Sequence, residues 1–206
     1  MKNWLSTLFF LFFVSFTFAQ SQQETKDKIL ADNKSILNAM DTKNYDAILD
    51  LTHPALYKIV DREMLKGAFK QIFEGNDELK IEILKSPNAQ FTVSDIMKTK
   101  DNASEYAFVT YPISMKMTYL KNTFEPSQYA TMEDIFKQQG MNAKFLSKNE
   151  MEVSKLSLSI AVKDASTNNQ WKYVNYEPNN MMFASIIPEE IMNKAKEYNT
   201  QLESKK

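Results

Sequence analysis

The chain of 206 residues has no cysteine, one histidine and three glycines. Without cysteine there are no disulfides, so packing and hydrogen bonds must supply the stability. The metal sites built from His and Cys are excluded; an all-oxygen site stays open, although no EF-hand spacing occurs. Three scattered glycines leave no glycine-rich phosphate loop. The formal net charge of −1 gives no indication of a nucleic-acid partner. We therefore expect no metal, no cofactor and no nucleic acid.

The first nineteen residues have the pattern of a targeting segment. Lys2 precedes an apolar run from Trp4 to Phe18, and Thr17 and Ala19 form a small-x-small cleavage site. The run is shorter than the roughly 20 residues of a spanning helix, and no cysteine is present for lipid attachment. The pattern predicts a signal peptide over residues 1–19 and export to the periplasm or the exterior. After cleavage we expect one domain, residues 20–206, with no stable membrane anchor.

Helical periodicity dominates the next part of the chain. An apolar stripe predicts a helix from Glu24 to Met40, and a second helix from Asn44 to Leu51 ends before His53-Pro54. Leu56 to Val60 has the composition of a short strand. Asp61 is a suitable cap for a third helix that Gly75 ends.

From Leu79 onward the apolar residues alternate with a period of two, which predicts strands. The longest such segment, Glu105 to Tyr119, exceeds the usual strand of roughly 3–10 residues. We therefore expect it to bend or bulge, and Pro112 in its middle favours a bend or an edge position. Two late segments, Lys155 to Asp164 and Gln170 to Tyr176, flank a turn-rich sequence and predict a hairpin.

The first strand of this hairpin alternates leucine, isoleucine and valine with serine, alanine and lysine. We expect the apolar row, from Leu156 to Val162, to face a core and the row from Ser157 to Lys163 to face mostly water. In the second strand Trp171 and Tyr173 share one face. A large aromatic side chain there should anchor whatever packs against the sheet.

Two further segments flank this hairpin. Lys121 to Ser154 interrupts the strands and is interpreted as an insertion, with a short helix from Met132 to Gln139 capped by Thr131 and polar loops on both sides. The apolar edge of this helix needs a partner, so we expect it over or beside the open end of the sheet. A C-terminal helix is predicted from Pro188 to about Gln201.

This order of helices and strands resembles the nuclear transport factor 2-like superfamily, of which the chain would be an exported bacterial member. The resemblance rests on KNYDAILDLTHPAL, on DREMLKGAFKQIFEG before LKIEIL, and on LSLSIAVKDASTNNQWKYVNY. It implies an α+β fold with N-terminal helices packed in the concave face of a strongly curved antiparallel sheet, a cone with a pocket at its open end. The insertion and the C-terminal helix depart from the family pattern. The family includes ketosteroid isomerases and dehydratases, but no motif here identifies catalytic residues, and a shared fold does not define an activity.

Asp95 is the first candidate for acid–base chemistry. In a regular strand it shares the apolar face of Phe91, Val93 and Met97, where burial would raise the pKa of its carboxyl. The alternative is a bulge or strand end near Ser94 that turns the carboxylate to solvent.

His53, the only imidazole, is the second candidate. Catalysis would require a neighbouring carboxylate or a pocket, whereas a structural role at the end of a helix requires neither. A helix C-terminus favours a protonated histidine.

Aromatic and methionine side chains suit a pocket for a lipid, a sterol or an aromatic compound, although the same residues also make ordinary cores. The candidate ligand-binding residues are Tyr111, Met115, Met117, Tyr119, Phe136 and Tyr173. Non-catalytic binding of a small apolar molecule or a protein partner is favoured. A cofactor-free acid–base enzyme and a homodimer formed through the sheet stay open as alternatives.

Overall fold

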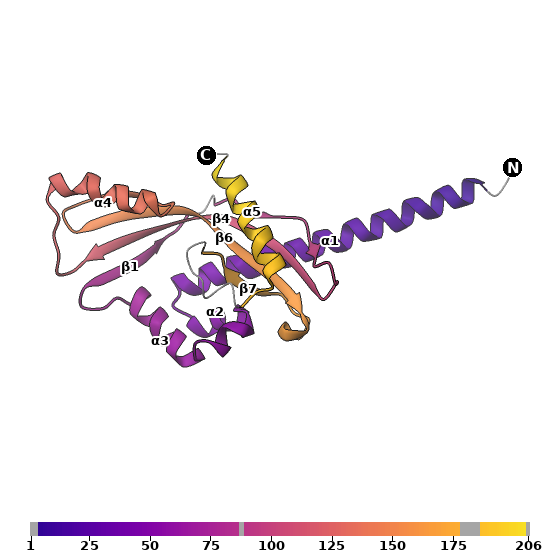
Figure 1. Cartoon of the computed structure of the whole chain (residues 1–206), viewed down its shortest axis with the longest axis horizontal. Coiled ribbons are helices and arrows are strands. Elements are labelled where there is room, and N and C mark those ends of the chain that lie inside the picture. The colour runs from indigo at the N-terminus through magenta and orange to yellow at the C-terminus, as the bar shows by residue number, and fades with distance from the viewer. Residues whose placement is uncertain (1–3, 87–88, 178–185, 205–206) are drawn as a thin grey trace.

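The computed structural model describes residues 4–86, 89–177 and 186–204, with side chains from residue 20 onward. Within these residues the fold is α+β, with five α-helices and a seven-stranded antiparallel sheet (Figure 1). The helices are α1 (Trp4–Asp41), α2 (Tyr45–Leu51), α3 (Arg62–Phe73), α4 (Pro126–Gln138) and α5 (Glu189–Glu203). The strands are β1 (Leu79–Leu84), β2 (Thr92–Val93), β3 (Met97–Lys98), β4 (Ser104–Tyr119), β5 (Asn142–Phe145), β6 (Glu150–Asp164) and β7 (Lys172–Asn175).

Two long strands, β4 and β6, form the centre of the sheet. They pair in one unbroken register from Ser104↔Asp164 to Thr118↔Glu150, so the expected bulge is absent from this pair. Pro112 is tolerated because the other side of β4 pairs only at residues 109–110 with β2 and 114–119 with β1 in this stretch. Its missing N–H falls in the interval between those two ladders.

The sheet is covered on both faces, which corrects the expectation of a mostly wet face. On the side that we name the α1 face, Ala161 and Trp171 pack with Ile29 of α1. On the opposite side, the α5 face, Phe108 and Ile160 pack with α5. Ser157 and Ser159, expected in water, are only 4% exposed because they lie on the α1 face.

An extra residue between β2 and β3 changes the face on which side chains lie. Val93 pairs with Val109, but Met97 pairs with Tyr106, so residues 94–96 contain one residue more than the opposing stretch of β4. Such a bulge reverses the alternation of side chains. Val93 therefore packs on the α1 face, whereas Met97 packs on the α5 face.

Side-chain caps begin both α2 and α3, and the cap of α3, Asp61, is the one that the sequence predicts. Asn44 accepts from the N–H of Ala47 at the start of α2, and Asp61 accepts from two N–H groups of α3. Gly75 follows α3 with φ of 86°. The strand expected at Leu56 to Val60 is wrong: Pro54–Lys58 is a 3₁₀ turn, which suits a proline at its first position.

The segment from Lys121 to Ser154 is more ordered than the sequence indicates. Its helix α4 begins at Pro126, and the Gln128 side chain accepts from the N–H of Glu125 at 2.8 Å, so Thr131 is not the cap. The flank expected to be a loop forms β5 and the first part of β6. Pairing along an existing strand supplies partners for these polar residues, which their composition does not reveal.

Helix α1 runs without interruption from the predicted signal peptide into the domain and projects beyond it (Figure 1). The side chains of residues 1–19, on which the signal-peptide prediction depends, lie outside the described part. Among the residues that are described, no helix has the length and apolar character needed to cross a membrane. The cleavage site after Ala19 therefore stays a prediction.

Candidate ligand-binding cavity

The described residues line two cavities of ligand size, of about 580 Å³ and about 620 Å³. The cavity of 620 Å³ lies between the α1 face of the sheet and the early helices. We name the larger one the central cavity. Most of its wall is apolar and comes from α1, α3, β1 and β4. Helix α3 contributes Leu65, Phe69, Ile72 and Phe73, and the edge strand β1 contributes Ile81 and Ile83.

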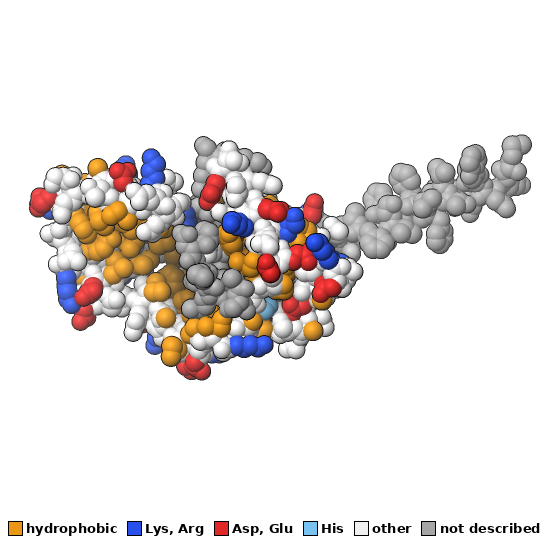
Figure 2. Space-filling model, viewed as in Figure 1, with side chains coloured by type: hydrophobic (Ala, Val, Ile, Leu, Met, Phe, Trp, Pro, Cys, Tyr) orange, Lys and Arg blue, Asp and Glu red, His pale blue; other side chains and the backbone are white. Residues whose placement is uncertain are grey.

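Helix α3 presents its apolar stripe to this cavity and not to a filled core. The stripe is strong, yet no residue of α3 is fully buried. Phe69 and Phe73 only border a small core that contains Tyr45, while Met64 is 68% exposed. Figure 2 shows a hollow lined with hydrophobic side chains between the α4 end and the centre of the molecule. An amphipathic helix over unfilled space is typical of a binding wall.

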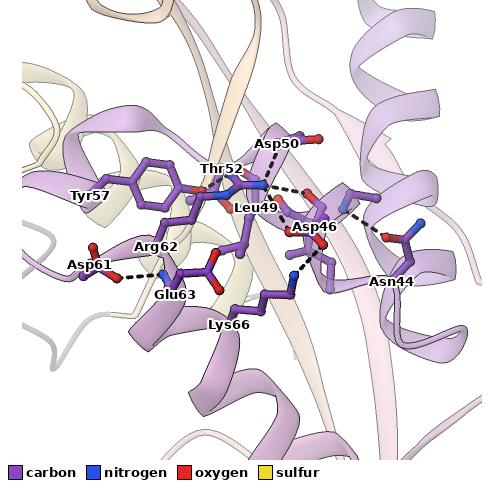
Figure 3. A network of polar contacts seen from close by, with 12 residues as sticks. Asn44, Asp46, Leu49, Asp50, Thr52, Tyr57, Asp61, Arg62, Glu63 and Lys66 are labelled. Atoms are coloured by element: carbon purple, nitrogen blue, oxygen red, sulfur yellow. Dashed lines mark hydrogen bonds and ion pairs between the residues drawn. The ribbon is translucent and has the colours of Figure 1, made fainter.

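A network of charged side chains fixes α3 relative to α2 (Figure 3). Arg62, at the start of α3, binds the Asp50 carboxylate at 2.7 Å and the Asp46 carboxylate at 3.5 Å. Lys66, one turn later, lies 2.6 Å from Asp46 and lowers the pKa of that carboxyl. Tyr57 donates to the carbonyl of Leu49, and the Arg62 guanidinium lies over its ring. The contacts hold one cavity wall without filling the cavity.

The opposite wall carries a set of polar side chains that we name the polar strip: Lys155, Ser157, Asn175 and Glu177. Lys155 donates to Glu177 at 2.7 Å, and the Asn175 amide donates to the same carboxylate oxygen at 2.8 Å. The Ser157 hydroxyl donates to Oδ1 of the Asn175 side-chain amide at 3.1 Å. These side chains come from β6, β7 and the residues just after β7, so sheet pairing brings them together.

Two of the predicted tyrosines border this cavity. Burial raises the pKa of Tyr111, with the Ser157 hydroxyl opposing this effect and the Glu177 charge adding to it. Burial also raises the pKa of Tyr173, whose hydroxyl donates to Asp32 of α1 at 2.7 Å and so adds to the rise. Both phenols are therefore neutral at physiological pH and serve as hydrogen-bonding groups.

The other predicted ligand-binding residues are divided between the cavity and a separate cluster. Met115 lines the cavity, but Met117, Tyr119 and Phe136 do not. They pack under α4 around Phe145, in the far-end cluster that also holds Met151 and Val153. Helix α4 thus packs on the strand-end side chains Met117 and Tyr119, as expected. No described residue of the insertion, Lys121 to Ser154, lines the central cavity, so the insertion does not close it.

Asp95 lies outside the cavity, and its carboxylate points to solvent. The side chain is 87% exposed and pairs with Lys26 of α1 at 2.7 Å, and this hydrogen bond lowers the pKa of the carboxyl. The interpretation of a buried carboxyl with a raised pKa is therefore wrong, and the alternative, a bulge near Ser94 that turns the carboxylate to solvent, is confirmed. The reason is the extra residue between β2 and β3: Asp95 lies in this bulge, and its side chain points away from the apolar face.

His53 is buried but has a structural position. Its Nδ1 accepts from the N–H of Ala55 and so caps the 3₁₀ turn, which requires a neutral ring with the proton on Nε2. Burial lowers the pKa of the imidazole, partly opposed by the charge of Asp164. The expectation of a protonated His53 at the end of α2 is therefore wrong, because the cap of the next turn and burial outweigh the helix terminus.

The polar strip was missed by the sequence interpretation. The signal was present in the alternation of Lys155, Ser157 and Ser159, but it was attributed to solvent exposure. No group of three or more His, Cys, Asp or Glu side chains in the described residues is placed to hold a metal ion. Comparison with models of known families gives no match, and comparison with curated proteins gives no relative.

Proposed function

We propose that this domain binds a small, largely apolar molecule in the central cavity and does not transform it. The observation that carries the proposal is the combination of a 620 Å³ volume with an apolar wall from α3 and β1. Ligand sites commonly have volumes of about 300–1,000 Å³, apolar linings and a few placed polar groups. The described charged groups that line the cavity, Lys155 and Glu177, neutralise each other, which favours binding over acid–base catalysis.

We further propose that the fold is the cone of the nuclear transport factor 2-like superfamily and that the protein is exported. The order of three N-terminal helices before a long antiparallel sheet supports the first proposal. The basic residue, the apolar run and the cleavage pattern of residues 1–19 support the proposal of export. In such a cone the cavity would correspond to the pocket between helices and sheet.

Uptake of a neutral apolar fluorophore such as Nile red tests the proposed function. Ile81 lines the cavity from edge strand β1, so Ile81→Trp should fill part of it and weaken probe binding about tenfold or more. Leu156→Trp is the matched control, because Leu156 is 37% exposed and alternates with cavity-facing Lys155 and Ser157. Equal probe binding by the parent and Ile81→Trp, with unchanged melting, would contradict the proposal.

A further inference from the structure

The polar strip gives the central cavity a defined chemical polarity. Lys155 and Ser157 lie two residues apart on β6, so their side chains share the α1 face. Asn175 and Glu177 lie beside them at the end of β7, and Asn175 pairs with Ser159 in the sheet. Polar groups therefore gather on one wall, while the walls from α3 and β1 are apolar. Among the described lining residues, a bound molecule meets charged groups at this wall only.

The charges in the strip are already balanced. The Lys155 ammonium lies 2.7 Å from Glu177, and the two side chains are only 23% and 38% exposed. Glu177 also accepts from Asn175 at 2.8 Å, which holds the carboxylate in place. In a partly buried site, two fixed groups of opposite charge stabilise each other. A ligand group that brings a second negative charge close to Glu177 is disfavoured.

We infer that the ligand is an uncharged amphiphile, with an apolar body and a hydroxyl, carbonyl or amide head placed at the polar strip. This inference rests on the proposed function and specifies the class of ligand. A carboxylate head at Lys155 would also lie beside Glu177 and would have to displace it. A neutral head of any of these kinds accepts from Lys155 or Asn175, and a hydroxyl or amide head also donates to Glu177, without disturbing the pair.

The test compares a long-chain fatty alcohol with the carboxylate of the same chain length, both titrated into the full chain at about pH 8, where the acid is ionised. The parent protein should bind the alcohol more tightly by about tenfold. Glu177→Gln keeps the shape of the side chain but frees the charge of Lys155. It should shift the affinity ratio toward the carboxylate by about tenfold or more.

Lys155→Gln provides the opposite change, because it leaves Glu177 unbalanced. It should shift the same ratio further toward the alcohol, and it keeps the test valid if Glu177→Gln fails to fold. Equal binding of both ligands by the parent, or ratios that neither variant moves, would overturn the inference while leaving apolar binding intact. Absence of binding of either ligand to the parent would overturn the proposed function itself.

Discussion

At the scale of single residues, His53 shows how a neighbouring turn decides a protonation state. The ring is 2% exposed, and its Nδ1 caps the 3₁₀ turn while Nε2 makes no hydrogen bond within the described residues. A protonated ring would lose the cap and place a charge in the core. The single imidazole of the chain is thus used for structure.

This position predicts a pH dependence of stability. Because the folded-state pKa of His53 lies below the unfolded value near 6.5, the unfolded chain takes up the proton first on acidification. The contribution of neutral His53 to the free energy of unfolding is present above about pH 6.5, the unfolded pKa. It is lost as the pH falls from there through the lower folded-state pKa. Urea unfolding should therefore show a decrease in the free energy of unfolding from about pH 7.5 to 5.5.

His53→Asn is the matched variant, because asparagine offers an acceptor to the N–H of Ala55 and does not titrate. Its stability should change less over the same pH interval than that of the parent. Parallel pH profiles for the two proteins would show that His53 is not the group responsible.

At the scale of elements, α4 and β5 form a unit that stabilises the far ends of β4 and β6. Tyr129 of α4 stacks on Phe145 of β5 at 4.1 Å between ring centroids, and the Glu133 carboxylate accepts from the N–H of Phe145 at 3.2 Å. The unit has its own apolar cluster, separate from the clusters around α1 and α5. We expect it to open locally with less effect on the rest of the fold.

Phe136→Ala tests this separation. Phe136 is partly buried in the far-end cluster, so the truncation should cost about 2 kcal/mol and speed amide exchange in α4 and β5. Ile135→Ala is the control, since Ile135 is 43% exposed and should change stability by less than about 0.5 kcal/mol. Loss of Nile red uptake in Phe136→Ala would show instead that α4 and the central cavity are coupled.

At the scale of the whole molecule, two helices from opposite ends of the chain cover the two faces of one sheet. On the α1 face the side chain of Ile29 is fully buried, and on the α5 face those of Ile191 and Ala195 are fully buried. The C-terminal helix is therefore part of the core, although the family pattern does not include it. Both central strands are protected from water along the half of the sheet that lies between these helices.

Removal of the predicted signal peptide should not weaken this arrangement. The ion pair between Lys26 of α1 and Asp95 and the buried side chain of Ile29 both lie beyond Ala19. A chain beginning at Gln20 should melt within a few degrees of the full chain, as expected for a change outside the core.

Mass spectrometry of the native protein should find Gln20 at or near its N-terminus; an intact Met1 in the mature protein would contradict the export prediction.

The features that depend on near neighbours in the chain can be predicted from the amino-acid sequence. The strand periods, the cap of α3 at Asp61 and the end of that helix at Gly75 follow from residues a few positions apart, and the structure confirms them. The shift in register between β2 and β3 could not be predicted, because the extra residue before Met97 has no signal in the composition of that segment. The candidate residues Tyr111, Met115 and Tyr173 line the central cavity, whereas Met117, Tyr119 and Phe136 do not. Composition cannot separate the two groups, because aromatic and methionine side chains are equally suited to a core and to a cavity.

Which face of each strand is covered, and what remains open between the layers, could be seen only in the folded molecule. The row with Ser157 and Ser159 has the same alternation whether it meets water or a helix, so its burial depends on α1, over a hundred residues away in the chain. The polar strip likewise exists only because β6 and β7 pair in one register. Periodicity is a local property, whereas the filling of space between elements depends on contacts between distant segments, and the cavity is a result of the latter.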